Sequence, residues 1–546
     1  MKPVMIRGSF QVKALQLVIL LHGGLFFFLG MNRHWGYLSS INDLGVFDQV
    51  VWNTLNGAFF QTTINPFGVT MNWLGFHFHP VLLLFVPLYW LYAGVEWFMA
   101  AQAAALALGA WPIFLLAEHQ LKSEKAGIAW ALIYLFNPFL LNAGGWDFHP
   151  ITLAVPFIAT AFLGIVQKNG RMLFWSSLAI LLCKEHLGLM VVGFGILWWI
   201  KHRSWKTAVV ISGLGLTHLF MVLGVAMPCF SPIGKPVMLG EGLGQLSRYG
   251  WLGGSPPEIL QTFLIRPGFV WQRIIDMGGH IYWLLLVIPF SVVLPLFGFS
   301  FLLPGLADLA ANTLSANPMP RSIWAYHSVG LVPILTAAAI GGVARLSTLQ
   351  WRFSGKELSG ISLAVALVCG YFFLPLPLKG AFNIWEPVNY FNWSDPSLRK
   401  VRLLLAEDFS LSAQANIGAQ FSRRPEIFLY PGGVGETDGI VLRLASPTAK
   451  INDMPANPAS LPQKNHPNWL DGHLQMDRTE YLASTECLLA GGEYGAAYWD
   501  DPWLVLLKGT GGDLPAVTRK IGQLKEAWRI DDAAYRGALA GCSAAY

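Results

Sequence analysis

The chain has 546 residues, of which 54% are hydrophobic and only 12% are charged, and its mean hydropathy is +0.48. A soluble globular domain carries about 25% charged residues, so the composition excludes an ordinary soluble protein and indicates an integral membrane protein. The sequence pI is about 8.8, but Lys and Arg lie in short clusters between apolar runs rather than on one face. We interpret this excess of positive charge as a topology signal and expect no nucleic-acid partner.

The first apolar run, about residues 14 to 29, follows Lys2, Arg7 and Lys13 and lacks a small-residue cleavage site. We therefore expect a signal-anchor helix with a cytoplasmic N-terminus. Further membrane helices are expected near 97–117, 126–142, 150–166, 172–183, 187–200, 207–227, 281–296, 298–314, 329–345 and 358–376. With about 11 spans, every basic cluster between helices lies on the cytoplasmic side. The protein is thus expected to be a multi-pass protein of the cell membrane with an extracytoplasmic C-terminal region.

Two apolar segments are too short to be simple spans. The run at 172–183 amounts to some 18 Å of helix, against a hydrocarbon core of roughly 30 Å. It should place Lys184, Glu185 and His186 below the outer surface, in a protein-lined or wet cavity. The run at 80–92 contains Pro87 and would break the alternation of basic clusters if it crossed. We predict a partly embedded or surface-lying helix there.

Beyond about residue 378 the chain loses its long apolar runs. The predicted fold is therefore mainly α, with a transmembrane domain at 1–378 and a small outer α/β domain at 379–546. Within the second domain we predict strands at 426–430, 439–444, 494–499 and 503–507, helices at 411–421, 478–490 and 515–527, and a loop at 447–467. Cys487 and Cys542 fall in this domain, where oxidising conditions permit a disulfide. No cysteine spacing resembles a zinc site.

The first outer loop, residues 31–78, is long and contains a helical pattern at 41–57. Apolar residues recur there at helical spacing, namely Leu44, Phe47, Val51 and Leu55. This pattern predicts an amphipathic helix near the membrane surface. Asp43 lies at its N-terminus, either as a helix cap or as the acid of a site. Asp48, about 140° further round the helix, should face water or a second polar wall.

Two His-Pro pairs stand where helices are expected to enter the membrane from outside. They are His77-Phe78-His79-Pro80 and Asp147-Phe148-His149-Pro150. Because proline is tolerated in a first helical turn, part of this pattern is start-of-helix chemistry. A single histidine is most often a hydrogen-bonded structural residue. The pairs Asp147 with His149 and His77 with His79 offer instead ligands for a divalent metal.

Lys184 and Glu185 are costly in a helical core unless they meet each other or an anionic ligand. Phosphate is the natural anion for an ammonium group at a membrane face, and a structural ion pair is the alternative. Ionisable residues at a bilayer mark a candidate site by default. The candidate substrate-binding residues are Asp48, His77, His79, His149, Lys184, Glu185, His186, Arg248, Tyr249, Tyr326 and His327.

The ordered set of motifs resembles a group of uncharacterised bacterial and archaeal membrane proteins over about residues 14 to 345. The motifs that carry it are the segment from Asp43 to Gln49, the two His-Pro entries, Lys184-Glu185-His186, the segment from Arg248 to Gly253, and Tyr326-His327. The segment from Ala413 to Pro431 resembles the start of the outer domain of that group. The group is similar in layout to the GT-C glycosyltransferases, which include the protein mannosyltransferases and lipid A aminoarabinose transferases.

The resemblance implies a polyprenyl-phosphate-linked sugar donor held between membrane helices, among membrane lipid. It also implies two catalytic acids, with Asp43 as a base or metal partner and Asp147 as the acid of the second outer loop, and Lys184 as a phosphate contact. The chain has Asp147-Phe148-His149 where those enzymes have an acidic pair. A divalent metal therefore stays open as a cofactor, with no ligand set assigned to it.

The leading hypothesis is an inverting transfer of a sugar to an acceptor at the outer face. A transporter or channel is the second hypothesis, because an embedded Lys-Glu-His and broken helices also describe a permeation path. No duplicated half is present in the sequence, and transport needs neither the long first loop nor the outer domain. A non-catalytic membrane scaffold is the third. The sequence identifies neither the sugar nor the acceptor.

Overall fold

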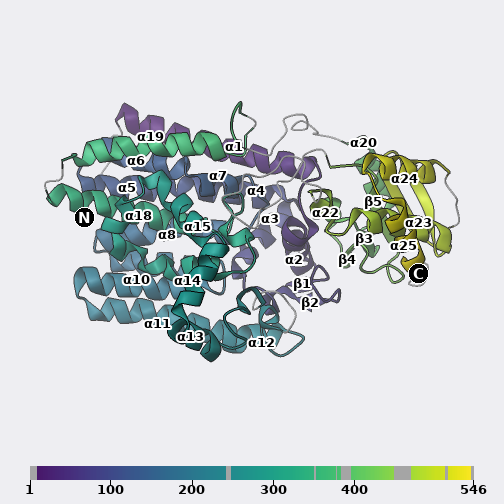
Figure 1. Ribbon diagram of the computed structural model, residues 1–546, viewed down its shortest axis with the longest axis horizontal. Coiled ribbons are helices and arrows are strands. Elements are labelled where there is room, and N and C mark those ends of the chain that lie inside the picture. The colour runs from purple at the N-terminus through teal and green to yellow at the C-terminus, as the bar shows by residue number, and fades with distance from the viewer. Residues whose placement is uncertain are drawn as a thin grey trace.

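The computed structural model describes residues 9–240, 247–349, 352–376, 378–382, 395–447, 469–510 and 515–542, except the side chains of Pro256 and Trp469. A bundle of helices occupies one end of the longest axis, and a small α/β unit occupies the other (Figure 1). The expected mainly helical membrane fold with a small C-terminal α/β region is confirmed.

Among the described residues, five helices are long and apolar enough to cross a membrane, or up to seven if each bent pair is one span. The five are α1 (Phe10–Trp35), Glu96–Leu121 with α4 (Glu96–Leu108) and α5 (Ala110–Leu121), Trp205–Phe230 with α11 (Trp205–Met221), a π-helical turn (Val222–Ala226) and α12 (Met227–Phe230), α18 (Leu331–Thr348), and α19 (Gly355–Phe373). The bent pairs are α6 (Glu124–Leu135) with α7 (Pro138–Gly144), at 54°, and α14 (Pro267–Asp276) with Gly279–Phe290, at 67°.

Shorter apolar helices complete the bundle. They are Pro80–Leu91, a 3-10 turn (Pro80–Phe85) followed by α3 (Val86–Leu91), then α8 (Ile151–Val166), α9 (Gly170–Leu181), α10 (Leu187–His202), and Phe299–Leu314, a 3-10 segment (Phe299–Gly305) followed by α17 (Leu306–Leu314). The expected short helix before Lys184 is confirmed, because α9 has 12 residues. The count of about 11 spans depends on these shorter helices and stays a prediction.

The segment predicted as one helix at 281–296 is broken, so that prediction is wrong in its continuity. It consists of α15 (Gly279–Val287), a 3-10 turn (Ile288–Phe290) and α16 (Leu294–Phe297). Pro289 and Pro295 lie at the starts of the last two pieces, and proline cannot donate the hydrogen bond that continues a helix. A further helix, α13 (Pro256–Ile265), lies in the preceding outer loop.

The predicted helix of the first outer loop is present but does not lie on a lipid surface. It begins as a π-helical turn (Ile41–Gly45) and continues as α2 (Val46–Leu55), in which seven of ten residues are buried. Its apolar side chains share one hydrophobic core with residues of the α/β unit, among them Ile417 and Val441. Figure 1 shows α2 between the bundle and that unit. The expected contact with the membrane surface is therefore corrected. The α/β unit of the same chain, rather than lipid, covers the apolar face of α2.

The C-terminal unit is built on a five-stranded mixed sheet in the order β4-β3-β5-β7-β6. Its strands are β3 (Leu411–Ala413), β4 (Ile427–Leu429), β5 (Gly439–Arg443), β6 (Tyr494–Asp500) and β7 (Trp503–Lys508). β3 is parallel to β4 and β5, and β7 is antiparallel to β5 and β6. A smaller sheet pairs β1 (Gln61–Thr62) with β2 (Met71–Asn72) in the first outer loop.

The helices of the unit are α20 (Pro396–Leu404), α21 (Ala415–Gly418), α22 (Trp469–Leu474), α23 (Arg478–Gly491), α24 (Pro515–Ala527) and α25 (Asp532–Cys542). The four predicted strands and the helices at 478–490 and 515–527 are confirmed. The helix predicted at 411–421 is wrong at its start, where the fully buried β3 pairs with two neighbours. Pairing inside a sheet overrides local helix preference. Most of the loop predicted at 447–467 lies outside the described residues.

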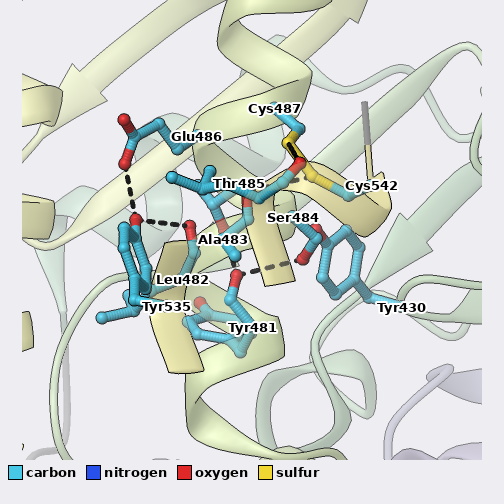
Figure 2. The surroundings of a disulfide bond; sticks show 11 residues. Tyr430, Tyr481, Leu482, Ala483, Ser484, Thr485, Glu486, Cys487, Tyr535 and Cys542 are labelled. Atoms are coloured by element: carbon cyan, nitrogen blue, oxygen red, sulfur yellow. Dashed lines mark hydrogen bonds between the residues drawn. A yellow bond between two sulfur atoms is a disulfide. The ribbon is translucent and has the colours of Figure 1, made fainter. Parts of the chain in front are cut away.

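Cys487 on α23 and Cys542 at the end of α25 form a disulfide, which the sequence permitted but did not decide. Figure 2 shows it joining the two helices, beside the hydrogen bond from Tyr535 to Glu486. The bond closes a loop with a sequence separation of 55 residues. It therefore limits the unfolded chain in the region that contains β6, β7 and α24.

Replacing both Cys487 and Cys542 with Ser is expected to destabilise the C-terminal unit by about 4 kcal/mol, because the unfolded state regains the entropy of a closed loop of that length. The change is measured as the thermal unfolding midpoint of the full chain, with proteolysis of the C-terminal unit as the readout of unfolding. Cys229→Ser is the matched control, since Cys229 is a free and exposed cysteine. Equal midpoints for the two variants would contradict the prediction.

The orientation of the chain is tested by reporter fusion. A reporter joined after residue 400, in α20, is expected to show an extracytoplasmic phenotype, because the basic clusters then remain inside. Alkaline phosphatase activity in intact cells is the measurement, and a fusion after Lys206 is the cytoplasmic control. A cytoplasmic phenotype after residue 400 would require a different number of spans.

Candidate functional site

Asp43 lies in the π-helical turn that precedes α2, but it does not cap that turn. Ser40 is the cap, and its hydroxyl accepts a hydrogen bond from the backbone N–H of Asn42 at 3.1 Å. The side chain of Asp43 is 34% exposed, and its Oδ1 lies 3.5 Å from Nε2 of His149. The helix-cap interpretation is therefore wrong. Asp43 is a half-buried acid that remains accessible.

The charge state of Asp43 follows from its neighbours. Burial acts to raise its pKa, but the contact with His149 and the positive charge of Arg33 outweigh burial. The pKa of Asp43 consequently lies below its ordinary value, so the carboxyl group is ionised at neutral pH. An ionised and accessible carboxylate is able to accept a proton or to bind a cation.

His149 is held rigidly beside this acid. Its Nδ1 lies 3.0 Å from the backbone carbonyl oxygen of Asp147, and the ring of Tyr326 stacks on it with centroids 3.4 Å apart. The side chain of His149 is only 9% exposed. Because one ring face and Nδ1 are constrained by the protein, the direction in which Nε2 meets Asp43 is restricted.

Asp147 is fully buried and both of its carboxylate oxygens are occupied. Nε of Arg33 donates to Oδ1 at 2.9 Å, and the backbone N–H of Ser40 donates to Oδ2 at 2.8 Å. The Arg33 guanidinium also lies 5.0 Å from the centre of the Trp146 ring. These contacts fix the position of Asp147, and a catalytic role for Asp147 stays a prediction. Asp147 anchors Ser40, the residue that caps the turn bearing Asp43.

Lys184, Glu185 and His186 follow α9, as expected, but Lys184 and Glu185 do not pair with each other. Glu185 is 2% exposed. Its Oε1 lies 3.1 Å from Nδ1 of His77, and its Oε2 accepts from the backbone N–H of Phe78 at 3.1 Å. Within the described part of the chain, no hydrogen bond or ion pair holds the half-buried ammonium group of Lys184. Glu185 is thus engaged by His77 and Phe78, and Lys184 is left for another anion.

His186 meets an acid that the sequence analysis missed. Its Nε2 lies 3.5 Å from Oδ1 of Asp308, which is 9% exposed on α17. A signal was present, because Asp308 is the single ionisable residue in the apolar run 298–314, and an acid in such a run is a functional candidate. Arg33 was missed as well. A cation at the C-terminal end of the first helix departs from the positive-inside pattern that the predicted topology implies.

Tyr326 and His327 belong to the segment between α17 and α18, and Tyr326 lies against His149. The rings of Tyr326 and His327 stack with centroids 4.2 Å apart. Burial is the largest cause that holds the pKa of His327 well below its ordinary value. The positive charges of Lys184, His149, Arg248 and His186 act in the same direction. His149, Lys184, His186 and Arg248, from three other segments of the chain, are therefore near enough to His327 to affect its charge. Asp43, His149, Lys184, His186, Tyr326 and His327, with Arg248 at the edge, are called the candidate site below.

Asp48 and Tyr249, two further predicted residues, also lie outside the candidate site. Asp48 is fully buried and accepts hydrogen bonds from the hydroxyls of Tyr89 and Ser422 at 2.6 and 2.5 Å, so its predicted exposure to water is wrong and the second polar wall is correct. The hydroxyl of Tyr249 donates to the backbone oxygen of Ala311 at 3.1 Å and fixes a 3-10 turn (Ser247–Tyr249) against α17. Both residues stabilise the fold rather than line the site.

None of the three cavities described below is lined by a residue of the candidate site. One of about 640 Å³ lies between α1 and the helices α4 and α5. A second of about 550 Å³ lies between the first outer loop and β4, and a third of about 200 Å³ lies beside Arg402 and Arg423. A common outward-opening pocket for Asp43, Asp147 and Lys184 therefore stays a prediction.

Over residues 33–445 the chain matches the family described as Predicted membrane protein (DUF2079). The chain belongs to this family. The expected membership of an uncharacterised membrane-protein family is thereby confirmed. The matched residues of this DUF2079 protein include the whole candidate site, Arg33, Asp147 and the strands β3, β4 and β5.

No curated protein matches the chain. Among solved structures, the chain is similar to the crystal structure of ArnT from Cupriavidus metallidurans bound to undecaprenyl phosphate. The identity is 11%, the similarity covers 91% of this chain and 99% of that chain, and the TM-score is 0.38. At that TM-score the likeness supports no conclusion about the activity or the ligand of this DUF2079 protein.

Proposed function

We propose that this DUF2079 protein is a glycosyltransferase that takes its sugar from a polyprenyl-phosphate donor at the outer membrane face. The observation that carries the proposal is the pairing of an ionised, accessible Asp43 with a fixed His149. This pair stands in a cluster that also offers the ammonium of Lys184. A base beside a cation is the arrangement that transfer from a phosphate leaving group requires.

In the proposed reaction Asp43 accepts the proton of the acceptor hydroxyl. The acceptor oxygen then forms a bond to the anomeric carbon, while the bond from that carbon to the donor phosphate oxygen breaks with inversion. The released polyprenyl phosphate carries the electron pair and the negative charge. Lys184 and Arg248 stabilise that charge as it develops. His149 orients Asp43, and the Arg33–Asp147 pair holds the turn in place through Ser40.

An anion is the expected ligand of Lys184 for a physical reason. A half-buried ammonium near a bilayer is costly unless a negative group meets it. The neighbouring acids are engaged elsewhere, since Glu185 lies against His77 and Asp308 lies against His186. Phosphate oxygens make strong charge-assisted hydrogen bonds with such a group.

The test is a transfer assay in proteoliposomes with polyprenyl-phosphate donors carrying a set of radiolabelled sugars. Release of polyprenyl phosphate together with labelled product is the expected result. A transporter would instead move labelled material without breaking the sugar–phosphate bond. The assay includes a cell-envelope extract as the source of acceptors. The proposal is wrong if the donor stays intact for every sugar under these conditions.

Lys184→Gln is expected to lower turnover by about a hundredfold or more, because the developing phosphate charge loses its ammonium partner. Lys184→Arg should retain part of the activity, since it keeps the charge but not the geometry. Steady-state kinetics with the polyprenyl-phosphate donor measure both effects. Lys206→Gln, an exposed position on α11, is the control. Unchanged turnover in Lys184→Gln would remove the phosphate contact from the mechanism.

A further inference from the structure

Three potential metal ligands from two segments far apart in the sequence lie close together, and one of them stands between Lys184 and His186 of the candidate site. His77 and His79 precede the 3-10 turn that begins at Pro80, and Glu185 lies between α9 and α10. One ligand atom from each residue lies within 4.8 Å of the other two. His79 and Glu185 are 3% and 2% exposed, so the cluster is an interior feature rather than a patch of surface acids.

One atom of this cluster has no hydrogen-bond partner. Nδ1 of His79 accepts a hydrogen bond from the indole N–H of Trp73 at 3.2 Å. Nε2 of the same ring is buried and has no partner among the described residues. A buried polar atom without a partner costs free energy, and such an atom in a native fold commonly marks an absent water or ion.

The other two residues are arranged as a support for the same position. Nδ1 of His77 lies 3.1 Å from Oε1 of Glu185, and the rings of His77 and His79 are nearly parallel, at 14°, with centroids 5.3 Å apart. The backbone N–H of Phe78 binds Oε2 of Glu185 at 3.1 Å. Glu185 is thereby fixed against the His77-Phe78-His79 segment and brings a negative charge to two imidazoles.

We propose that His77, His79 and Glu185 bind one divalent transition-metal ion of the zinc type. Two imidazole nitrogens and one carboxylate oxygen form a usual three-residue ligand set, with a further position left for water or a ligand. At metal–ligand bonds of 2.0–2.1 Å the ligand atoms lie about 3.4 Å apart. Ligand atoms that are now up to 4.8 Å apart would therefore move together by up to about 1.4 Å. Coordination by Nε2 of His79 moves the ring proton to Nδ1, and Trp73 then gives up its hydrogen bond to that nitrogen.

This metal site is distinct from Asp43. The ring of Phe47 contacts both places, with centroids 5.8 Å from His79 and 6.0 Å from His149. The ion would join the first outer loop to the segment after α9, next to Lys184. The proposal does not depend on the proposed sugar transfer, because it concerns metal binding alone.

The test uses the full chain in detergent, purified without a polyhistidine tag and stripped of metal with a chelator. Calorimetric titration with Zn²⁺ is expected to show one equivalent bound. His79→Ala and Glu185→Gln should each weaken that binding by more than about 100-fold, since even outer-shell partners of a metal site contribute 10–100-fold. His280→Ala, an exposed histidine on α15, should bind as the wild type does.

Glu185→Gln keeps the shape of the side chain and an oxygen acceptor for Phe78, so it removes the charged metal ligand without creating a cavity. Size-exclusion profiles check the fold of each variant. Visible absorption of the Co²⁺-loaded chain gives a second readout, which the variants should lose. The proposal is overturned if the stripped wild type binds no Zn²⁺ equivalent, or if Glu185→Gln binds Zn²⁺ like the wild type. Loss of binding in Asp43→Asn with retention in Glu185→Gln would place the ion at Asp43 and overturn it equally.

Discussion

Asp43→Asn is expected to reduce sugar transfer by about a hundredfold or more while leaving the protein folded. Asn keeps the size of the side chain and an oxygen toward His149, but it cannot accept the acceptor's proton, and loss of a general base typically costs that much in rate. Because Ser40 rather than Asp43 caps the turn, the substitution removes no cap. Initial rates of polyprenyl-phosphate release, at equal amounts of folded protein, measure the effect.

Asp276→Asn provides the matched control, because Asp276 is an exposed acid at the end of α14 and lies outside the candidate site. Its rate should equal that of the wild type. Full transfer activity in Asp43→Asn would exclude Asp43 as the base, and the fully buried Asp147 could not replace it without rearrangement.

Asp147→Ala is expected to destabilise the protein by about 3–5 kcal/mol, because it leaves the guanidinium of Arg33 buried without its counterion. The backbone N–H of Ser40 loses its acceptor in the same variant, so the turn carrying Asp43 should become less ordered. The thermal unfolding midpoint in detergent measures the first effect. The transfer rate of the remaining folded protein measures the second.

The companion variant Arg33→Gln with Asp147→Asn removes both charges together. It should recover part of the lost stability, since a neutral amide pair leaves no unpaired charge in the interior. The single variants Arg33→Gln and Asp147→Asn, together with the double variant, form a cycle that isolates the interaction energy of the pair. An unfolding midpoint for Asp147→Ala equal to that of the wild type would show that the pair does not support the fold.

The length of the apolar runs explains where the prediction of the fold succeeded. Apolar runs located the helices of the bundle, including the short α9, because each run is coded locally. The prediction failed where distant segments decide the structure. Residues 411–413 form a strand because β4 and β5 flank them, and α2 is buried because the C-terminal unit covers it.

The candidate site shows the same division. The cost of charge near a bilayer was enough to select Asp43, His149 and Lys184 from the sequence. It could not distinguish their roles, because these depend on partners supplied by other segments. The partner of Asp147 lies 114 positions away and a partner of Asp48 lies 374 positions away. Asp147 holds Ser40, which caps the turn that bears Asp43. Asp48 links α2 to the C-terminal unit through Ser422.

That second link changes what the boundary near residue 378 means. Asp48 and Gln49 of α2 are held by Ser422 and by the backbone oxygen of Pro425, and Gly45 leaves room for the backbone of Ala419. A chain truncated at 378 would expose a charged carboxylate and an apolar helix face that are now internal. The boundary therefore divides the sequence but not the cooperative unit of folding, and the membrane bundle should not be expected to fold correctly when expressed alone.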